Sequence, residues 1–206
     1  MQFQPYHLYH VYNQGNNRQR IFHNENDYQT FLNLYKRLFP SRCDTVAWCL
    51  MPNHFHFMLY TDEKCLRLEK QGGNLLNPVS NAVRMLLSGY ARIYNSRYGR
   101  SGSIFRQKTK AKCLTEISLD KCVAKENLLY ATTCFHYIHQ NPLIATLCKS
   151  METWPYSSYK DYHLLSQETL CNMELAKKCC GFDPENFAEV SNRLYALKMG
   201  KGGEGV

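Results

Sequence analysis

No stretch of this sequence is long and apolar enough to span a bilayer, and its start, MQFQPYHLYH, lacks the basic and then apolar order of a signal peptide. We therefore expect a cytoplasmic protein with no membrane partner. The ten cysteines form no CxxC pair, and none lies at zinc-finger spacing to two histidines. We expect reduced thiols rather than a disulfide framework, several of them buried as small apolar residues.

Acidic residues are missing from the whole stretch 81–112, although the chain contains 17 of them beside 25 Lys and Arg. The basic residues of this stretch are Arg84, Arg92, Arg97, Arg100, Arg106, Lys108, Lys110 and Lys112. A solvated helix face would normally mix both signs, so the asymmetry favours a phosphate-rich partner, that is, nucleic acid. Arg100, Arg106 and Lys108 lie on or near a glycine-containing turn and are the strongest candidates for contact with a phosphate backbone.

The spacing of apolar residues predicts strands over 6–13, 45–51, 54–60 and 104–114, and helices over 27–38, 79–94 and about 118–139. Residues 70–78 are predicted to form a loop. Ser118 is expected to cap the last helix, and Asn141, which precedes Pro142, is expected to close it. Strands mixed with covering helices indicate an α+β fold, with an antiparallel sheet and helices on one face. The other face of the sheet would then be open.

Two histidines lie one residue apart in MPNHFHFMLY, residues 51–60. Because side chains alternate across a strand, His54 and His56 share one face, while Phe55 and Phe57 point to the other face, toward a core. Taken alone, the pattern is more often two half-exposed histidines near a turn. With a further ligand close by, the two imidazoles would hold one divalent metal ion.

The stretch FHYIHQNPLIA, residues 135–145, offers that ligand. Tyr137 and Asn141 are four residues apart and are therefore neighbours on a helix. If the end of this helix meets the open sheet face, Asn141 would join the two histidines at the metal, with Tyr137 beside it. A phenol is more acidic than an alcohol, so it attacks phosphorus and later departs readily, and a phosphotyrosine link stores the bond for rejoining. A tyrosine taken alone is more often a packed aromatic.

Together, MPNHFHFML with its histidine pair and YIHQNPLIA with Tyr137 and Asn141 resemble the single-tyrosine HUH transposases, in particular the REP-associated tyrosine transposases. Three further stretches, 9–32, 90–112 and 154–162, follow in the same order as in that family. The resemblance covers about residues 5–162. It departs at Lys108-Thr109, where the family more usually has an aromatic after the basic residue, and at Asn141, where related transposases have glutamine.

The resemblance implies a ferredoxin-like antiparallel sheet with helices on one face and the HUH histidines on a central strand. It implies a Mg²⁺- or Mn²⁺-dependent transposase that nicks and rejoins single-stranded DNA near hairpins, such as REP-like repeats, through a 5′-phosphotyrosine. His54, His56 and Asn141 would be the metal ligands, and Tyr137 the nucleophile. The residues expected to contact DNA are Arg18, Arg20, Arg84, Arg92, Arg97, Arg100, Arg106, Lys108, Lys110 and Lys112.

The chain is predicted to contain an HUH nuclease domain, residues 1–162, and a small helical extension with a disordered tail, residues 163–206. Two other functions stay open. A non-catalytic hairpin-binding protein derived from such an enzyme would keep the basic stretch without needing the histidines and the tyrosine together. A metal-binding or structural protein would not need the basic stretch. A monomer and a homodimer both fit the sequence.

Overall fold

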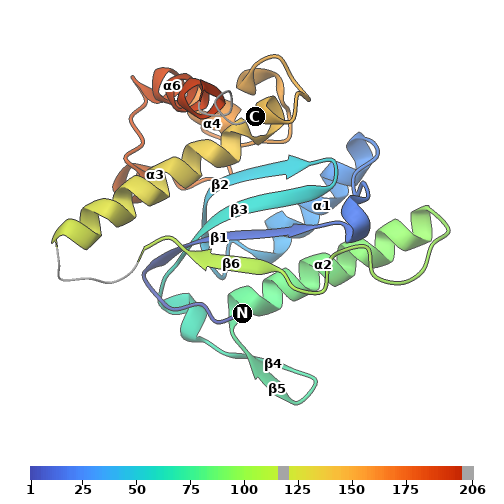
Figure 1. The fold of residues 1–206 in the computed structure, drawn as a ribbon. Helices are drawn as coiled ribbons and strands as arrows, with labels where there is room; N and C mark the ends of the chain where they lie inside the picture. Colours follow the sequence, from blue (N-terminus) through green and yellow to red (C-terminus); the bar gives the residue numbers. More distant parts are fainter. Residues whose placement is uncertain (116–120, 201–206) are drawn as a thin grey trace.

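A four-stranded antiparallel sheet forms the centre of the computed structural model, which describes residues 1–115 and 121–200. Its strands are β1 (His7–Gln14), β2 (Asp44–Met51), β3 (His54–Thr61) and β6 (Lys110–Cys113), in the spatial order β2-β3-β1-β6 (Figure 1). Helix α1 (Glu25–Leu38) connects β1 to β2, and α2 (Pro78–Arg97) lies between β3 and β6. This is the ferredoxin-like arrangement, so the expected fold class is confirmed, with the histidine strand β3 in the interior of the sheet.

Helices α1 and α2 cover one face of this sheet (Figure 1). They begin at Asn24 and Asn77, whose side-chain oxygens accept backbone N–H groups of the first turn and so satisfy donors that the helix leaves free. The apolar stripes of the two helices then pack on the sheet. Phe31 of α1 lies 5.3 Å from Phe55 of β3 and 5.1 Å from Tyr90 of α2, measured between ring centroids. The core between the helices and the sheet is therefore largely aromatic.

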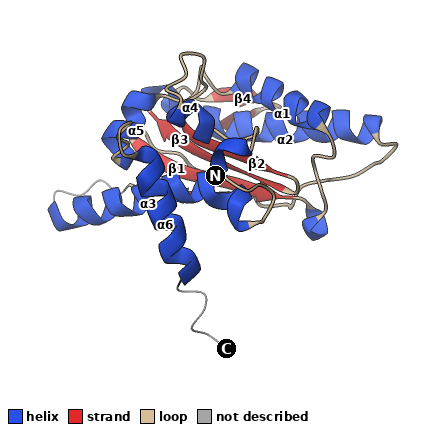
Figure 2. Cartoon of the chain, turned by 90° about the horizontal axis from the view of Figure 1, so that it is seen from above, coloured by secondary structure: helices blue, strands red, loops and turns tan. Residues whose placement is uncertain are grey.

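The opposite face of the sheet is not left open, because α3 (Lys121–Ile144) packs across β2 and β3. The helices α5 (Met173–Cys180) and α6 (Phe187–Gly200) pack against α3, and α5 also contacts β2. The short helix α4 (Tyr159–His163) lies along β2 as well, where Tyr162 donates to Val46 O. Figure 2 shows the sheet between α1 and α2 on one side and α3 on the other. The prediction of helices on one face is therefore correct for α1 and α2, but the prediction of an open second face is wrong. Helix α3, which carries Tyr137, forms a third layer over the sheet face that carries His54 and His56.

Helix α3 passes through Pro142 and ends at Ile144, so Asn141 does not close it as expected. Pro142 has no N–H to give to the carbonyl four residues before it, which belongs to Ile138. The Asn141 side-chain Nδ2 donates to Tyr137 O at 2.7 Å and lies 3.5 Å from Ile138 O, so it replaces the missing donor only weakly. Thr146, with a φ of 54°, then turns the chain out of the helix. The predicted cap Ser118 lies outside the described residues.

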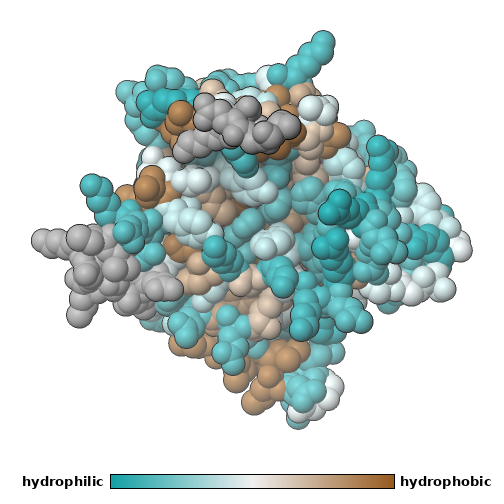
Figure 3. All heavy atoms as spheres, in the orientation of Figure 1, coloured by the Kyte–Doolittle hydropathy of each residue, from teal (hydrophilic) through white to brown (hydrophobic). Residues whose placement is uncertain are grey.

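Two predicted segments differ from the structure. Residues 70–78 contain part of a small hairpin of β4 (Glu69–Gln71) and β5 (Asn74–Leu76) rather than only a loop. Gly72 and Gly73, at φ values of 54° and 85°, form its turn, and most side chains would be strained there. The predicted strand 104–114 is shortened to β6, preceded by an isolated bridge between Phe105 and Gly15. Figure 3 shows apolar surface at the hairpin end of the molecule, where Leu66, Leu68 and Leu75 are exposed.

Short 3₁₀ turns complete the described elements: η1 (Asn16–Arg18), η2 (Glu63–Leu66) and η3 (Met151–Thr153). After η3, Tyr156 stacks on Tyr28 of α1 at 3.6 Å, and Trp154 Nε1 donates to Leu50 O. This contact fixes the segment 154–156 against the rim of the sheet. The nine described cysteines form no disulfide with one another. None of the helices in the described part of the chain is long and apolar enough to cross a membrane.

Candidate active site

The pairing of the strands places the side chains of the candidate site next to one another on one face of the sheet. His56 lies between Cys49 of β2 and Tyr12 of β1, and Tyr12 in turn lies opposite Lys110 of β6. His54 lies opposite Gln14 of β1 by the same register. Because side chains alternate, all of these residues point to the face that carries α3. The basic edge of β6 and the histidine pair, far apart in the sequence, therefore share one surface.

Each of the two histidines has its Nδ1 engaged by a neighbouring side chain. Their ring centroids lie 4.9 Å apart. His54 Nδ1 contacts the Asn53 side-chain oxygen at 2.5 Å, and His56 Nδ1 contacts Nε2 of His10 at 2.9 Å. His56 Nε2 is buried and has no hydrogen-bond partner among the described residues. An imidazole whose Nδ1 is engaged and whose Nε2 is unpartnered is suited to bind a metal ion through Nε2.

Burial keeps these rings neutral at pH 7. It lowers the pKa of His54 to about 4 and the pKa of His10 to about 4, the latter also because of the nearby Lys112 cation. The pKa of His56 is likewise lowered by burial, and then by the two neighbouring histidines. Neutral imidazole is the form that ligates metals, so the pair is ready to bind a cation over the physiological pH range.

The turn between β2 and β3 holds the start of the histidine strand. Gly15 N donates to Asn53 O at 2.8 Å, and Asn53 Nδ2 donates to the carbonyl of Arg18 at 3.2 Å. At Gly15 a Cβ atom would lie only 2.3 Å from Gln19 O, so only glycine fits this close approach. The predicted DNA-contact residue Arg18 therefore lies beside this turn, and Arg20 follows on the same connection between β1 and α1.

Tyr137 reaches the histidine face from α3. Its ring centroid lies 5.8 Å from that of His56 and 6.5 Å from that of His10. Lys198 of α6 places its Nζ over the same ring, 4.2 Å from the centroid. Burial raises the pKa of Tyr137, Cys134 adds to this effect, and the Asn141 amide opposes it. The phenol is therefore protonated at rest and has a cation beside it.

Asn141 lies one turn farther along α3 than Tyr137. Its amide nitrogen is used by the helix, as described above, which leaves only its oxygen for a cation. His54, His56 and Tyr137 line one pocket, and Asn141 is not among the described residues that line it. In the described part of the chain no group of three or more His, Cys, Asp or Glu side chains is placed to share a metal ion. The third ligand thus stays a prediction.

A pocket of about 390 Å³ joins the histidines, the tyrosine and the basic edge. It is lined by Tyr12, Asn13, Gln14, His54, His56, Arg106, Lys108, Lys110 and Tyr137. The Asn13 side chain anchors its basic wall, because Nδ2 donates to Arg106 O at 3.0 Å and to Thr109 Oγ1 at 2.9 Å. Since Arg106 and Lys108 are exposed, the pocket offers several cations next to the tyrosine.

A larger hollow of about 820 Å³ continues this basic wall toward α2. Arg106, Lys108 and Lys110 line it as well, and Arg84 extends it from the helix side. Arg84 is oriented by the Asn81 side-chain oxygen at 2.9 Å. Four of the predicted DNA-contact residues therefore line two neighbouring hollows, one of which contains the tyrosine, and we call these four residues the basic path.

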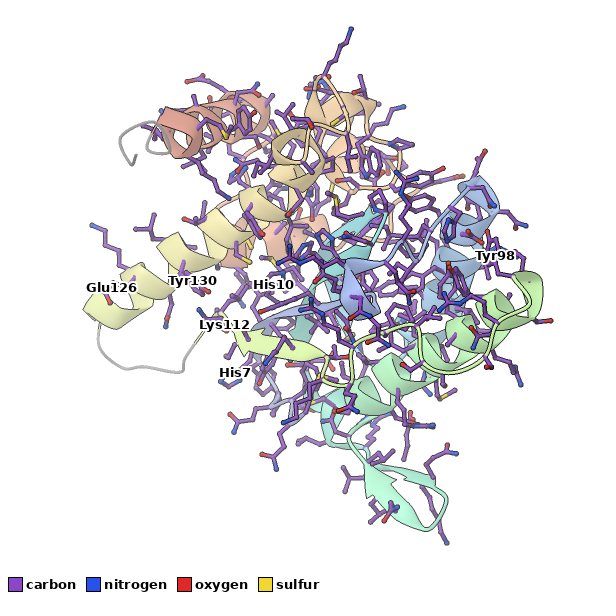
Figure 4. The ribbon with its side chains drawn as sticks, turned by 45° about the vertical axis from the view of Figure 1, so that its right-hand side comes forward. His7, His10, Tyr98, Lys112, Glu126 and Tyr130 are labelled. Carbon is purple, nitrogen blue, oxygen red and sulfur yellow. The ribbon has the colours of Figure 1, made fainter. Side chains whose placement is uncertain are left out.

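The remaining predicted contact residues lie away from this path. Lys112 of β6 packs over the Tyr130 ring of α3 at 4.6 Å, as the labelled residues in Figure 4 show. Near the end of α2, Arg97 is ion-paired with the buried Asp27, and Arg100 packs on Tyr94. Arg92 lines a separate hollow between α1 and α2. The structure thus groups only part of the acid-free stretch around the site.

Sequence reasoning missed His10, Asn13 and Lys198. The alternation of residues 7–14 places His10 on the same strand face as Tyr12, but only the register with β3 brings it to His56. Asn13 carries no local signal for its role. Lys198 comes from the C-terminal extension, and no sequence pattern there indicates a contact with Tyr137.

Comparison with known proteins adds a structural relative. No family model and no curated protein matches the sequence. Among solved structures, a REP-associated tyrosine transposase bound to a REP hairpin is similar with a TM-score of 0.50 and 16% identity, over 82% of this chain and 89% of that one. Two structures of a bacterial tRNA(His) guanylyltransferase-like protein are less similar, each with a TM-score of 0.36 and 10% identity. The complex with GTP matches over 71% of this chain and 71% of that one, and the complex with ATP over 68% and 61%. The chain therefore has the fold of a REP-associated tyrosine transposase.

Proposed function

We propose that this protein nicks and rejoins single-stranded DNA near hairpins, as a transposase of the tyrosine type does. The observation that carries the proposal is the meeting of His54, His56 and Tyr137 at one pocket with a basic wall. The shared fold supports it, and the REP hairpin in the similar structure suggests the partner. Hairpin DNA such as REP-like repeats, encountered in the cytoplasm, is the substrate we propose.

In the proposed step a bond forms between Tyr137 Oη and a backbone phosphorus, while the bond from that phosphorus to the 3′ oxygen breaks. The phenol loses its proton and the departing 3′ oxygen gains one. The products are a 5′-phosphotyrosine and a free 3′-hydroxyl. Rejoining reverses the step, and it needs no external energy source because one phosphoester replaces another.

The residues present fit a divalent cation, because both histidines engage Nδ1 and His56 Nε2 is left without a partner. His54 and His56 would hold Mg²⁺ or Mn²⁺, with Asn141 or a DNA oxygen as a further ligand. When bound, the cation supplies a Lewis acid that polarises a phosphate oxygen. The chain's own share is to orient the two rings and to hold Tyr137 beside them.

The experiment that tests this function uses labelled single-stranded hairpin DNAs, among them repeats adjacent to the gene, with the full chain. We expect a covalent protein–DNA adduct on a denaturing gel with Mn²⁺ and none with a chelator. Salt-sensitive hairpin binding without any adduct would overturn the nicking reaction and favour the non-catalytic hairpin-binding protein. Neither binding nor adduct would overturn both.

The basic path predicts which charges bind DNA. Lys108→Gln is expected to weaken hairpin binding and to reduce the slope of log K against log salt by about 1, because one phosphate contact and its released counterion are lost. Arg92→Gln is the matched control, since it removes the same charge on the side of α2 that faces α1. Binding isotherms at several salt concentrations measure both variants. Equal salt slopes for Lys108→Gln and wild type would contradict the prediction that Lys108 contacts a DNA phosphate.

The position of Lys198 over the Tyr137 ring predicts that its charge assists the attack by Tyr137. A cation over the ring stabilises the negative charge that develops on Oη as the proton leaves. We expect Lys198→Met to slow adduct formation at saturating DNA roughly tenfold, which corresponds to about 1.4 kcal/mol, and Lys198→Arg to retain most of the rate. Single-turnover rates measure this effect. A Met variant that reacts like wild type would exclude it.

A further inference from the structure

A third histidine lies behind the candidate metal ligands. His10 of β1 and His56 of β3 are both buried, at 8% and 5% exposure, and their rings are nearly parallel, 24° apart, with centroids 5.0 Å apart. His10 Nε2 lies 2.9 Å from His56 Nδ1. Figure 4 shows His10 beneath α3 and close to Lys112, its register partner on β6. The His10 ring also lies 6.5 Å from that of Tyr137, but its Nε2 is directed to the candidate metal ligand His56.

The contact between two ring nitrogens allows only one hydrogen. Either His56 Nδ1 carries it and donates to His10, or His10 Nε2 carries it and donates to His56. In the first case His56 Nε2 has a free lone pair. In the second case His56 Nε2 carries the hydrogen and is unable to ligate a metal. The two arrangements therefore correspond to a binding and a non-binding form of the site.

Two observations favour the first arrangement. His56 Nε2 is buried without a partner among the described residues, so an N–H there would stay an unsatisfied donor, whereas a bare lone pair there would be satisfied by the proposed cation. At the neighbouring ligand, His54 Nδ1 contacts the Asn53 oxygen, which only accepts, so His54 carries its hydrogen on Nδ1 and leaves Nε2 bare. The orientation of the Asn53 amide is itself fixed, because its Nδ2 donates to Arg18 O. The two rings then present equivalent lone pairs to one cation.

We propose that His10 is a positioning residue that accepts the Nδ1 hydrogen of His56 and thereby fixes the tautomer and ring orientation needed to bind a divalent cation. The inference rests on the proposed function for the use of that cation. It extends that function by assigning a role to a residue on β1 outside the paired histidines. Hydrogen-bond partners of metal-ligating histidines typically change metal affinity 10- to 100-fold when they are removed.

The test measures Mn²⁺ affinity without DNA, by titration calorimetry and by the electron paramagnetic resonance signal of free Mn²⁺. His10→Leu removes the acceptor, and we expect affinity to fall about 10- to 100-fold. His10→Gln places an oxygen near the position of Nε2 and is expected to restore most of the affinity. His7→Leu is the matched control, because His7 is a buried histidine of the same strand that bonds only to Pro5 O. Thermal unfolding of each variant reports whether it is folded.

A second measurement needs no variant. Nitrogen-15 NMR of the imidazoles in the wild type, without metal, is expected to show the His56 hydrogen on Nδ1 and a bare Nε2. A hydrogen on Nε2 would overturn the proposal, and so would a His10→Leu protein that binds Mn²⁺ as tightly as wild type or a wild type that binds no Mn²⁺. Failure of the DNA-nicking reaction alone would leave the tautomer and Mn²⁺ results intact, so the two failures are distinguishable.

Discussion

Tyr137→Phe is expected to abolish the covalent protein–DNA adduct, with a fall in rate of at least about 10⁴-fold, as for loss of other catalytic nucleophiles. The substitution removes one oxygen and keeps the ring that packs between His56 and Lys198. Hairpin affinity is therefore expected to stay within about twofold of wild type, since the basic wall is unchanged. Adduct formation on a denaturing gel and binding by mobility shift measure the two effects separately.

Tyr130→Phe is the matched control for this prediction. Tyr130 lies on the same helix, is 41% exposed and packs on Lys112 rather than at the histidines. It is expected to form adduct at the wild-type rate. An adduct that persists in Tyr137→Phe would contradict the assignment. Mass spectrometry of the DNA-linked peptide would then test Tyr12, which lines the same pocket.

The second large effect concerns the histidine pair. His54→Ala and His56→Ala are each expected to lower the rate of adduct formation roughly 10³-fold, because a metal ion contributes several kcal/mol of charge stabilisation at phosphate. A chelator should have the same effect on wild type. His56→Ala is also expected to lower the melting temperature, since it leaves a cavity and removes the partner of His10. His54 is half-buried, so His54→Ala separates the loss of ligation from the loss of packing.

His163→Ala is the control for the histidine variants, because His163 is exposed at the end of α4 and contacts no residue of the pocket in the described structure. Its adduct rate is expected to equal that of wild type. Adduct formation that is insensitive to chelator and to both histidine substitutions would rule out a role for metal in the reaction. The two histidines would then be structural residues of the sheet.

The fold could be predicted well from local patterns and from the resemblance. A run that is apolar on both faces predicted β2, alternation predicted the faces of β3, and the apolar stripes of α1 and α2 predicted two helices close to their observed bounds. Pairs close in the sequence were also predictable. His54 and His56 share a face because strand geometry requires it, and Tyr137 and Asn141 are neighbours because helix geometry requires it.

Predictions from local patterns were wrong at the end of α3 and in part of the acid-free stretch 81–112. Pro142 was expected to stop α3, yet the helix continues to Ile144, and the Asn141 amide bonds to Tyr137 O within the helix. The acid-free stretch predicted one binding surface, but Arg97 instead pairs with the buried Asp27. Net charge along a sequence does not report which cations are neutralised by acids from other helices.

The sequence by itself determined most of the central strands and helices of this protein, the faces that they present, and the choice of the histidine pair and the tyrosine as candidate site residues. Tertiary structure alone decided which elements meet. The register of β1 with β3 brings His10 to His56, the pairing of β6 with β1 adds Lys110, and the packing of α3 and α6 brings Tyr137 and Lys198 over them. The physical reason is that periodicity fixes direction within one element, whereas contacts between elements depend on pairing and packing across the whole core.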